Sequence, residues 1–194
     1  MTKLLLLAIV LLSASVVTGQ TPSTSDCKMT FARAPEIRGL RLGMTIDQAL
    51  AVFPGSQADS ALQARLAKDN FGEQYTSVDP AKYDSKEKFI DVNGITLSFL
   101  DARLFYFSIW YKGPEWKSDE QFAARVAEAL NLPGVGSWKH APNVLQLACD
   151  GFLLSVMSTG SNTIALQDVR MDVAKIVNDR AEIPKEKARR AFKP

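Results

Sequence analysis

Few residues in this sequence have the types and spacing that catalysis requires. His140 is the single histidine, and it lies in residues 139–142 (KHAP), which predict a loop before a strand. Ser-His-Asp and Cys-His sites both need a histidine beside the nucleophile, and no Gly-x-Ser-x-Gly elbow presents a serine anywhere in the chain. We therefore predict no catalytic residue, and we interpret His140 as an exposed loop histidine.

The sequence predicts no metal or cofactor site either. Cys27 and Cys149 are far apart in sequence, and with one histidine they make no zinc ligand set. An Asp-rich calcium loop and a glycine-rich phosphate loop are both missing from the sequence. Two carboxylates can meet from any part of a fold, so a carboxylate-based cell-wall hydrolase stays open as an alternative function.

The clearest binding chemistry lies in residues 104–111 (LFYFSIWY). Alternate side chains of a strand face opposite ways, which predicts two different faces. The core face would consist of Phe105, Phe107, Ile109 and Tyr111. The second face would consist of Leu104, Tyr106, Ser108 and Trp110. A strand that is apolar on both faces is either covered on both sides or shows an aromatic surface to a partner. In the first of these cases, an insertion over residues 56–88 or the C-terminal helix would cover the second face.

If the second face is open, it is the predicted binding site. Tyrosine and tryptophan are enriched among the residues that dominate binding energy. The predicted partner-binding residues are therefore Tyr106, Trp110 and Trp116, and Trp138 is a further candidate for the same patch.

Caps, periodicity and turn residues place the elements around this segment. Helices are predicted over residues 46–53, with a capping box from Thr45 to Gln48, over 60–68, and from Ser118 to about 130. Strands are predicted over 89–92, 95–100, 104–111, 144–149, 152–158 and 163–167, with turns at 93–94, 101–103 and 150–151. Residues 70–86 are predicted to be a long loop. The fold class is α+β, an antiparallel sheet packed by short helices.

The two halves of the chain follow the same order of capped helix, hairpin and further strand. Residues 93–99 (NGITLSF) align locally with residues 150–156 (DGFLLSV). This match predicts a tandem helix-plus-hairpin repeat, with chance similarity between two hairpins as the alternative. The predicted organisation is a signal peptide over 1–19, an arm over 20–36, halves over 37–113 and 114–170, and a charged helical tail over 171–194, interrupted at Pro184.

Residues 37–50 (IRGLRLGMTIDQAL) resemble the opening of small exported domains of the BamE/SmpA-OmlA type. In that family a Gly-Met-Thr turn opens a short helix that packs on an antiparallel sheet, so the resemblance implies this fold. The tandem layout is similar to that of β-lactamase inhibitory protein. The chain departs from the lipoprotein members because no cysteine directly follows the signal peptide, and no residue matches an inhibitor's contact residues.

The first twenty residues predict export. Lys3, the apolar run 4–12, and the small residues Val17 and Gly19 form a signal peptide with cleavage after Gly19. Its apolar core is shorter than the roughly 20 residues that span a bilayer. Export places Cys27 and Cys149 in an oxidising compartment, which predicts a disulfide between them, with two buried free thiols as the alternative.

Charge and composition complete the functional prediction. The net charge of +2 disfavours nucleic acid as a partner. We predict an exported, non-catalytic envelope protein of bacterial origin, periplasmic or secreted, which binds a protein or another envelope macromolecule through the aromatic sheet face. Besides the hydrolase, the alternative is a passive structural component that the basic tail over residues 185–194 holds to an anionic surface.

Overall fold

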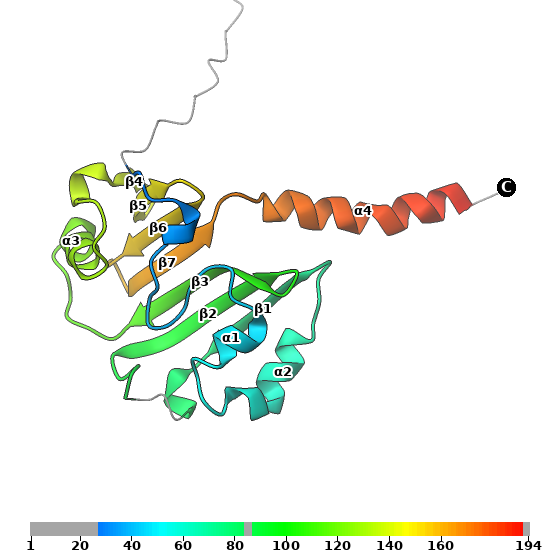
Figure 1. The fold of residues 1–194 in the computed structure, drawn as a ribbon, viewed down its shortest axis with the longest axis horizontal. Helices are drawn as coiled ribbons and strands as arrows, with labels where there is room; N and C mark the ends of the chain where they lie inside the picture. The colour runs from blue at the N-terminus through cyan, green and yellow to red at the C-terminus, as the bar shows by residue number, and fades with distance from the viewer. Residues whose placement is uncertain (1–26, 84–86, 192–194) are drawn as a thin grey trace, which may run out of the picture.

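The structure, a computed structural model, describes residues 27–83 and 87–191. The predicted signal peptide, residues 20–26 of the arm and the last three residues of the tail lie outside this range. The described chain forms one antiparallel sheet with helices packed against it (Figure 1). The predicted α+β class is confirmed.

The sheet has seven strands in the order β1-β2-β3-β7-β6-β5-β4. The strands are β1 (Glu73–Val78), β2 (Val92–Leu100), β3 (Arg103–Tyr111), β4 (Lys139–Ala141), β5 (Val144–Cys149), β6 (Phe152–Met157) and β7 (Asn162–Asp168). The α-helices are α1 (Ile46–Leu50), α2 (Ser60–Leu66), α3 (Asp119–Ala129) and α4 (Val173–Ala191).

Two meanders meet in the middle of this sheet. Strands β1, β2 and β3 form the first meander, and β5, β6 and β7 form the second. Their last strands, β3 and β7, pair with each other, with Phe107 opposite Leu166 and Ile109 opposite Ile164. Each meander follows a helix in the chain, α2 before the first and α3 before the second.

One face of the sheet carries the hydrophobic core. Ile95, Leu97, Phe107 and Ile109 are completely buried at its centre. The same layer continues through Leu145, Leu147, Phe152, Leu154, Val156, Ile164 and Leu166. Helices α1, α2 and α3 cover this layer with buried side chains that include Leu50, Leu62 and Phe122.

Helix α1 begins as the sequence predicts. The Thr45 hydroxyl accepts a hydrogen bond from the Gln48 N–H at 3.2 Å, and Gln48 Oε1 accepts one from the Thr45 N–H at 2.9 Å. This reciprocal pair is the capping box. The helix is shorter than predicted and ends at Leu50, but Phe53 still packs into the core.

Residues 56–88 add an edge to the sheet. The predicted second helix is α2, and Asp59 caps it by accepting hydrogen bonds from the Ala61 and Leu62 N–H groups. The predicted long loop over 70–86 is wrong, because residues 73–78 pair with β2 along their whole length. The Gly, Pro and Asp residues around this strand are typical of loops, and the alternation over residues 73–78 is too short to indicate a strand against them.

The predicted hairpin turn at Asn93-Gly94 is also wrong. Both residues lie inside β2, where the pairing with β3 shifts register between Val92 and Gly94. The turn between β2 and β3 is Asp101-Ala102, whose φ angles of 49° and 60° are both positive, as a two-residue hairpin turn requires. The predicted turn at residues 150–151 is confirmed, with Gly151 at a φ of 87°.

The N-terminal arm is fastened to the far end of the second meander. Cys27 and Cys149 form the predicted disulfide, with their Cα atoms 4.9 Å apart. Next to it, the Asp150 N–H donates a hydrogen bond to the Met29 carbonyl at 3.0 Å. The arm therefore belongs to the folded body from Cys27 onward rather than from residue 37.

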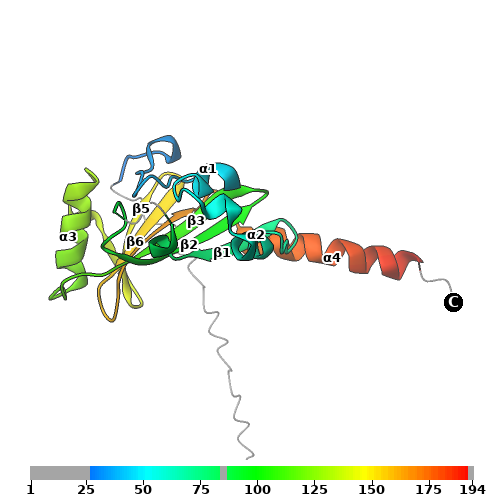
Figure 2. The ribbon, with the colours of Figure 1, turned by 90° about the horizontal axis from the view of Figure 1, so that it is seen from below.

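Helix α4 projects away from the sheet (Figures 1 and 2). In the first half of the helix, Arg180 donates to both carboxylate oxygens of Asp101 at 2.8 Å, which ties the helix to the β2–β3 turn. The predicted interruption at Pro184 is wrong, because the helix continues through this residue. Across residues 27–83 and 87–191, no helix combines the length and the apolar character that crossing a membrane requires.

Candidate functional site

The sheet face opposite the core is open over the described residues. The N-terminal segment and α1 lie on one side of the sheet in Figure 2. On the other side, Trp110 is 40% exposed and Tyr75 is 56% exposed. Neither expected cover lies over them: the 56–88 insertion supplies α2 and the edge strand β1, and α4 projects away. The covered-face alternative therefore fails for the part of the chain that the structure describes.

Strand register arranges the open face in rows that cross the strands. The middle row consists of Ser77, Thr96, Ser108, Ala165, Ser155 and Gln146, each opposite the next from β1 to β5. Neighbouring strands lie about 4.8 Å apart, so this row is about 24 Å long. Its members are small or polar and uncharged, and they form a low floor.

Larger side chains stand on both sides of this floor. Tyr75 and Tyr106 flank it on one side, in the row that passes through Ser98. Trp110 and Met157 flank it on the other side, in the row that passes through Thr163. The result is a hollow of about 550 Å³. We call it the trough, and its lining is Tyr75, Thr96, Tyr106, Ser108, Trp110, Val144, Gln146, Ser155, Val156, Met157, Thr163 and Ala165.

Trp110 is held flat against the sheet. A Cβ atom at Gly94, its cross-strand partner, would lie 3.1 Å from Cε3 and 3.4 Å from Cζ3 of the indole. The missing side chain of Gly94 therefore makes room for the indole of Trp110. An aromatic ring seated on a glycine in this way is partly fixed before any ligand arrives, which lowers the entropy that binding must remove.

The sheet brings together two of the predicted binding residues and separates the others. Tyr106 and Trp110 both line the trough. Trp116 lies outside it, stacked on Phe122 with ring centres 5.5 Å apart. Trp138 is 6% exposed, and its indole N–H donates to the Pro133 carbonyl at 3.0 Å. Trp138 is therefore a core residue and does not extend the patch.

The predicted alternation of β3 holds from Tyr106 to Trp110 but fails at the start of the strand. Leu104 pairs with Phe99 and Tyr106 pairs with Ser98, so Phe105 is an extra residue in a β-bulge. Leu104 consequently faces the core at 1% exposure, and Phe105, although buried, is not part of the core cluster. The bulge corrects the predicted faces of these two residues.

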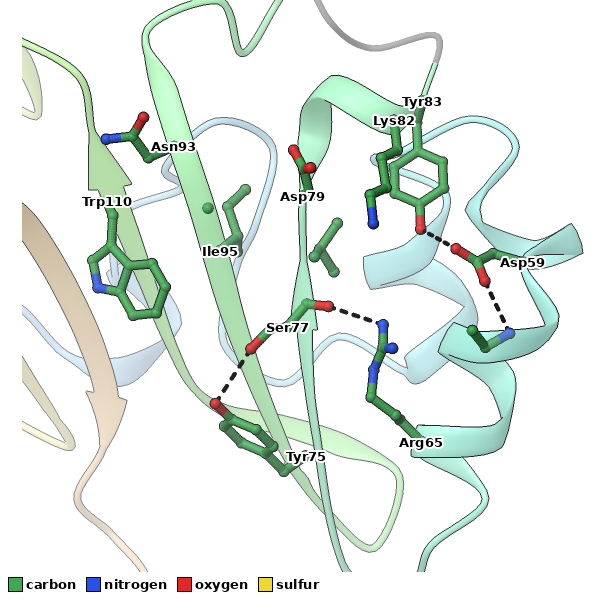
Figure 3. Close-up of a pocket in the computed structure, with 13 residues that line it drawn as sticks. Asp59, Arg65, Tyr75, Ser77, Asp79, Lys82, Tyr83, Asn93, Ile95 and Trp110 are labelled. Atoms are coloured by element: carbon green, nitrogen blue, oxygen red, sulfur yellow. Dashed lines mark hydrogen bonds between the residues drawn. The ribbon is translucent and has the colours of Figure 1, made fainter.

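A second hollow, of about 470 Å³, adjoins the trough at β1 and shares Tyr75 and Trp110 with it. Figure 3 shows these two rings on one side of it and the Arg65, Lys82 and Tyr83 side chains on the other. We call this hollow the charged cleft, because its lining includes Asp59, Arg65, Asp79 and Lys82.

The Asp59 and Tyr83 side chains in the charged cleft stabilise the local fold. The Tyr83 hydroxyl donates to Asp59 Oδ2 at 2.7 Å. The Leu62 N–H and then the Tyr83 hydroxyl lower the pKa of Asp59, so this carboxyl is ionised near neutrality. Burial, together with the hydrogen bond to Asp59, raises the pKa of Tyr83 to about 12.

We expect the Tyr83 hydroxyl to make the stability of the fold depend on pH in the alkaline range. Because its pKa in the fold lies above the ordinary value of 10.0, its contribution is complete below pH 10 and is lost as the pH rises to about 12. Urea unfolding at closely spaced pH values should show a smaller loss of stability over this interval for Tyr83→Phe than for the wild type. The exposed Tyr75→Phe serves as the control, and an equal loss in both variants would contradict the assignment.

His140 lies in β4 rather than in the predicted loop, and its side chain is 71% exposed, as expected. Its Nε2 atom is 2.9 Å from Glu120 Oε1. A hydrogen bond from Ser118 is the main cause that lowers the pKa of Glu120. Within the described residues, no group of three or more His, Cys, Asp or Glu side chains is placed to hold a metal ion.

Much of the trough was missed by reasoning from the sequence. Tyr75 and Ser77 lie in the segment that was predicted to be a loop. Gln146, Ser155 and Thr163 lie in strands that were predicted, but their alternation does not say which strands become neighbours. The pairing of β3 with β7 supplies this information, because it joins the two meanders into one face.

Comparisons of the chain with protein-family models, with curated proteins and with solved structures found no match in any of the three. The resemblance of residues 37–50 to BamE-type domains therefore stays a prediction. Any statement about function has to rest on the geometry of the open face and on the chemistry of its side chains.

Proposed function

We propose that this chain is an exported, non-catalytic protein that binds a macromolecule of the cell envelope through the trough. The observation that carries the proposal is an uncovered sheet face on which Tyr75, Tyr106 and Trp110 flank a low polar floor. Exposed tyrosine and tryptophan side chains supply large contact areas at a low cost in conformational entropy. A hollow of about 550 Å³ gives these rings a concave setting.

The disulfide and the predicted signal peptide support export, and a periplasmic or secreted location in a bacterium is part of the proposal. A domain of the BamE type, as residues 37–50 suggest, is the family that we propose for its first half. The helix that follows the Gly-Met-Thr turn and packs on an antiparallel sheet agrees with this proposal.

The alternative of a carboxylate-based hydrolase needs a carboxyl group that keeps its proton near neutral pH. No carboxylate lines the trough. In the charged cleft, the pKa of Asp59 is shifted downward, away from the range of a general acid. The alternative of a passive structural component gives the exposed Tyr75 and Trp110 rings no role.

Affinity capture from envelope extract tests the proposal. The bait is the chain without its predicted signal peptide, compared with the double variant Tyr106→Ala/Trp110→Ala and with Trp116→Ala as a matched control outside the trough. We expect the wild type and the control to retain the same bound material, whether protein or polysaccharide, and the double variant to lose at least nine tenths of it. Equal retention by the double variant, or no bound material at all, would contradict the proposal.

A further inference from the structure

The trough differs from the rest of the chain in its charge. Charged residues make up 23% of the whole sequence, yet none of the twelve residues that line the trough is charged. Charged residues lie beyond both ends of the trough: in the charged cleft next to Tyr75 and Trp110, and at Lys139 of β4, which pairs with Gln146. Because a charged ligand group would lose its hydration here without gaining an ionic partner, the trough favours an uncharged ligand.

The hydrogen-bonding groups of the floor are mostly hydroxyls. Thr96, Ser108 and Ser155 in the trough, and Ser77 where the row enters the charged cleft, carry hydroxyls that can both donate and accept. Thr96 and Ser108 are only 6% and 3% exposed at the bottom of the trough, and the Gln146 amide donates to the Ser155 hydroxyl at 3.2 Å. Except at Ala165, which separates Ser108 from Ser155, these polar side chains repeat at the spacing of the strands, about 4.8 Å. This spacing is close to the advance of one sugar unit along an extended β-linked glycan, whose own hydroxyls also donate and accept.

The flanking rings suit the same class of ligand. Tyr106 and Trp110 stand on opposite sides of the floor at Ser108, so a chain lying on the floor passes between them. Sugar rings have apolar C–H faces that pack on aromatic rings, and hydroxyl edges that hydrogen-bond to polar side chains. The seating of the Trp110 indole on Gly94 fixes one of these rings in position.

An extended peptide is a poorer match for this surface. Peptides bind sheets chiefly by adding a strand at an edge, where backbone N–H and C=O groups are free. The trough instead runs across the strands over side chains. At the β1 edge, Arg65 of α2 already donates to the Ser77 carbonyl at 3.2 Å.

We infer that the ligand of the trough is an uncharged, extended β-linked glycan chain that lies across the strands between Tyr106 and Trp110. This inference rests on the proposed function and deepens it by naming the chemical class of the partner. At about 24 Å, the floor accommodates a chain of about five sugar units at one unit per strand spacing.

Cellohexaose and N-acetylchitohexaose, both uncharged and β-1,4-linked, are the probes. Each has a matched control: maltohexaose has the same sugar as cellohexaose in a coiled α-linked chain, and the fully deacetylated chitosan hexamer has the same linkage with positive charges. The three tryptophan indole N–H signals of the ¹⁵N-labelled protein are the readout. We expect at least one probe to shift the Trp110 signal while the buried Trp138 signal stays fixed, and both controls to bind at least tenfold more weakly than their probes.

Variants of single residues test whether the probe binds in the trough. By calorimetry, Trp110→Ala should weaken binding of the probe at least tenfold. Ser155→Gln should do the same, because the longer glutamine side chain would occupy the space above the floor of the trough. Trp116→Ala should leave the affinity unchanged. An unshifted Trp138 signal in Ser155→Gln and Trp110→Ala reports that each variant is folded.

Two results would overturn the inference: no shift of the Trp110 signal by either probe up to its solubility limit, or an affinity that Ser155→Gln leaves unchanged. Failure of the glycan inference and failure of the proposed function are distinguishable. If the probes fail but capture from envelope extract still depends on Tyr106 and Trp110, the partner is of another class and the trough remains a binding site. If capture is also independent of these rings, both the glycan inference and the proposed function are wrong.

Discussion

Reduction of the Cys27–Cys149 disulfide is expected to lower the free energy of unfolding by about 3–5 kcal/mol. The bond joins residues that are 122 positions apart in sequence, and closing so long a loop removes much of the entropy of the unfolded chain. The measurement is urea unfolding with and without dithiothreitol. In the reduced protein the unfolded state is less compact, so the denaturant slope should rise while the midpoint falls.

The chain contains no other cysteine, so the reductant has a single target. The variant Cys27→Ala/Cys149→Ala should match the reduced wild type and should not respond to dithiothreitol. An unchanged urea midpoint on reduction would mean that the hydrogen bond from Asp150 to Met29 and the packing around it hold the arm without the bond.

Local signals in the sequence predicted a large part of this fold, because these signals act within a few residues. The capping box at Thr45 fixes the start of α1, and the glycine at 151 fixes the β5–β6 turn through its positive φ. The same reasoning failed at Asn93-Gly94, because this pair, although typical of a hairpin turn, lies inside β2 here, where Gly94 faces a large cross-strand ring. Only the position of Trp110 across the sheet decides between these two uses.

The candidate site was predictable only to the extent of one strand. Alternation along residues 104–111 identified Tyr106 and Trp110, which share a face because β3 is regular between them. The floor of the trough depends on which strands become neighbours and on their register. Ser155 and Ala165 come to lie beside Ser108 through the pairing of β3 with β7 and of β7 with β6, and no periodicity within a single segment specifies that arrangement.

A second large loss of stability is expected on substitution of Arg170, which packs between the N-terminal arm and β7. Its guanidinium donates from Nε and Nη2 to the two oxygens of Asp168 at 2.9 and 2.7 Å, and its Cζ atom lies 3.3 Å from the centre of the Phe31 ring. The Asp168 side chain is 4% exposed, whereas that of Arg170 is 51% exposed. Loss of the guanidinium therefore leaves a buried carboxylate without its cation.

We expect Arg170→Met, which keeps most of the stem that packs on Phe31, to lower the free energy of unfolding by about 2–3 kcal/mol. A broken buried pair costs more, but the half-exposed position of Arg170 lets water reach the site and reduces the penalty. Arg125→Met is the matched control. Arg125 pairs with Glu128 on the surface of α3, with side chains 66% and 71% exposed, and its loss should cost under about 0.5 kcal/mol.

A further variant separates the unpaired charge from the lost packing. If the cost of Arg170→Met comes from the buried carboxylate, adding Asp168→Asn should recover part of it, because the amide carries no charge and can still accept from the Arg170 N–H, which lies 3.0 Å from Asp168 Oδ1. If the cost comes from the contact with Phe31, the double variant should be no more stable than Arg170→Met alone. Equal costs for Arg170→Met and Arg125→Met in urea unfolding would show that neither the buried charge nor the ring contact stabilises the arm.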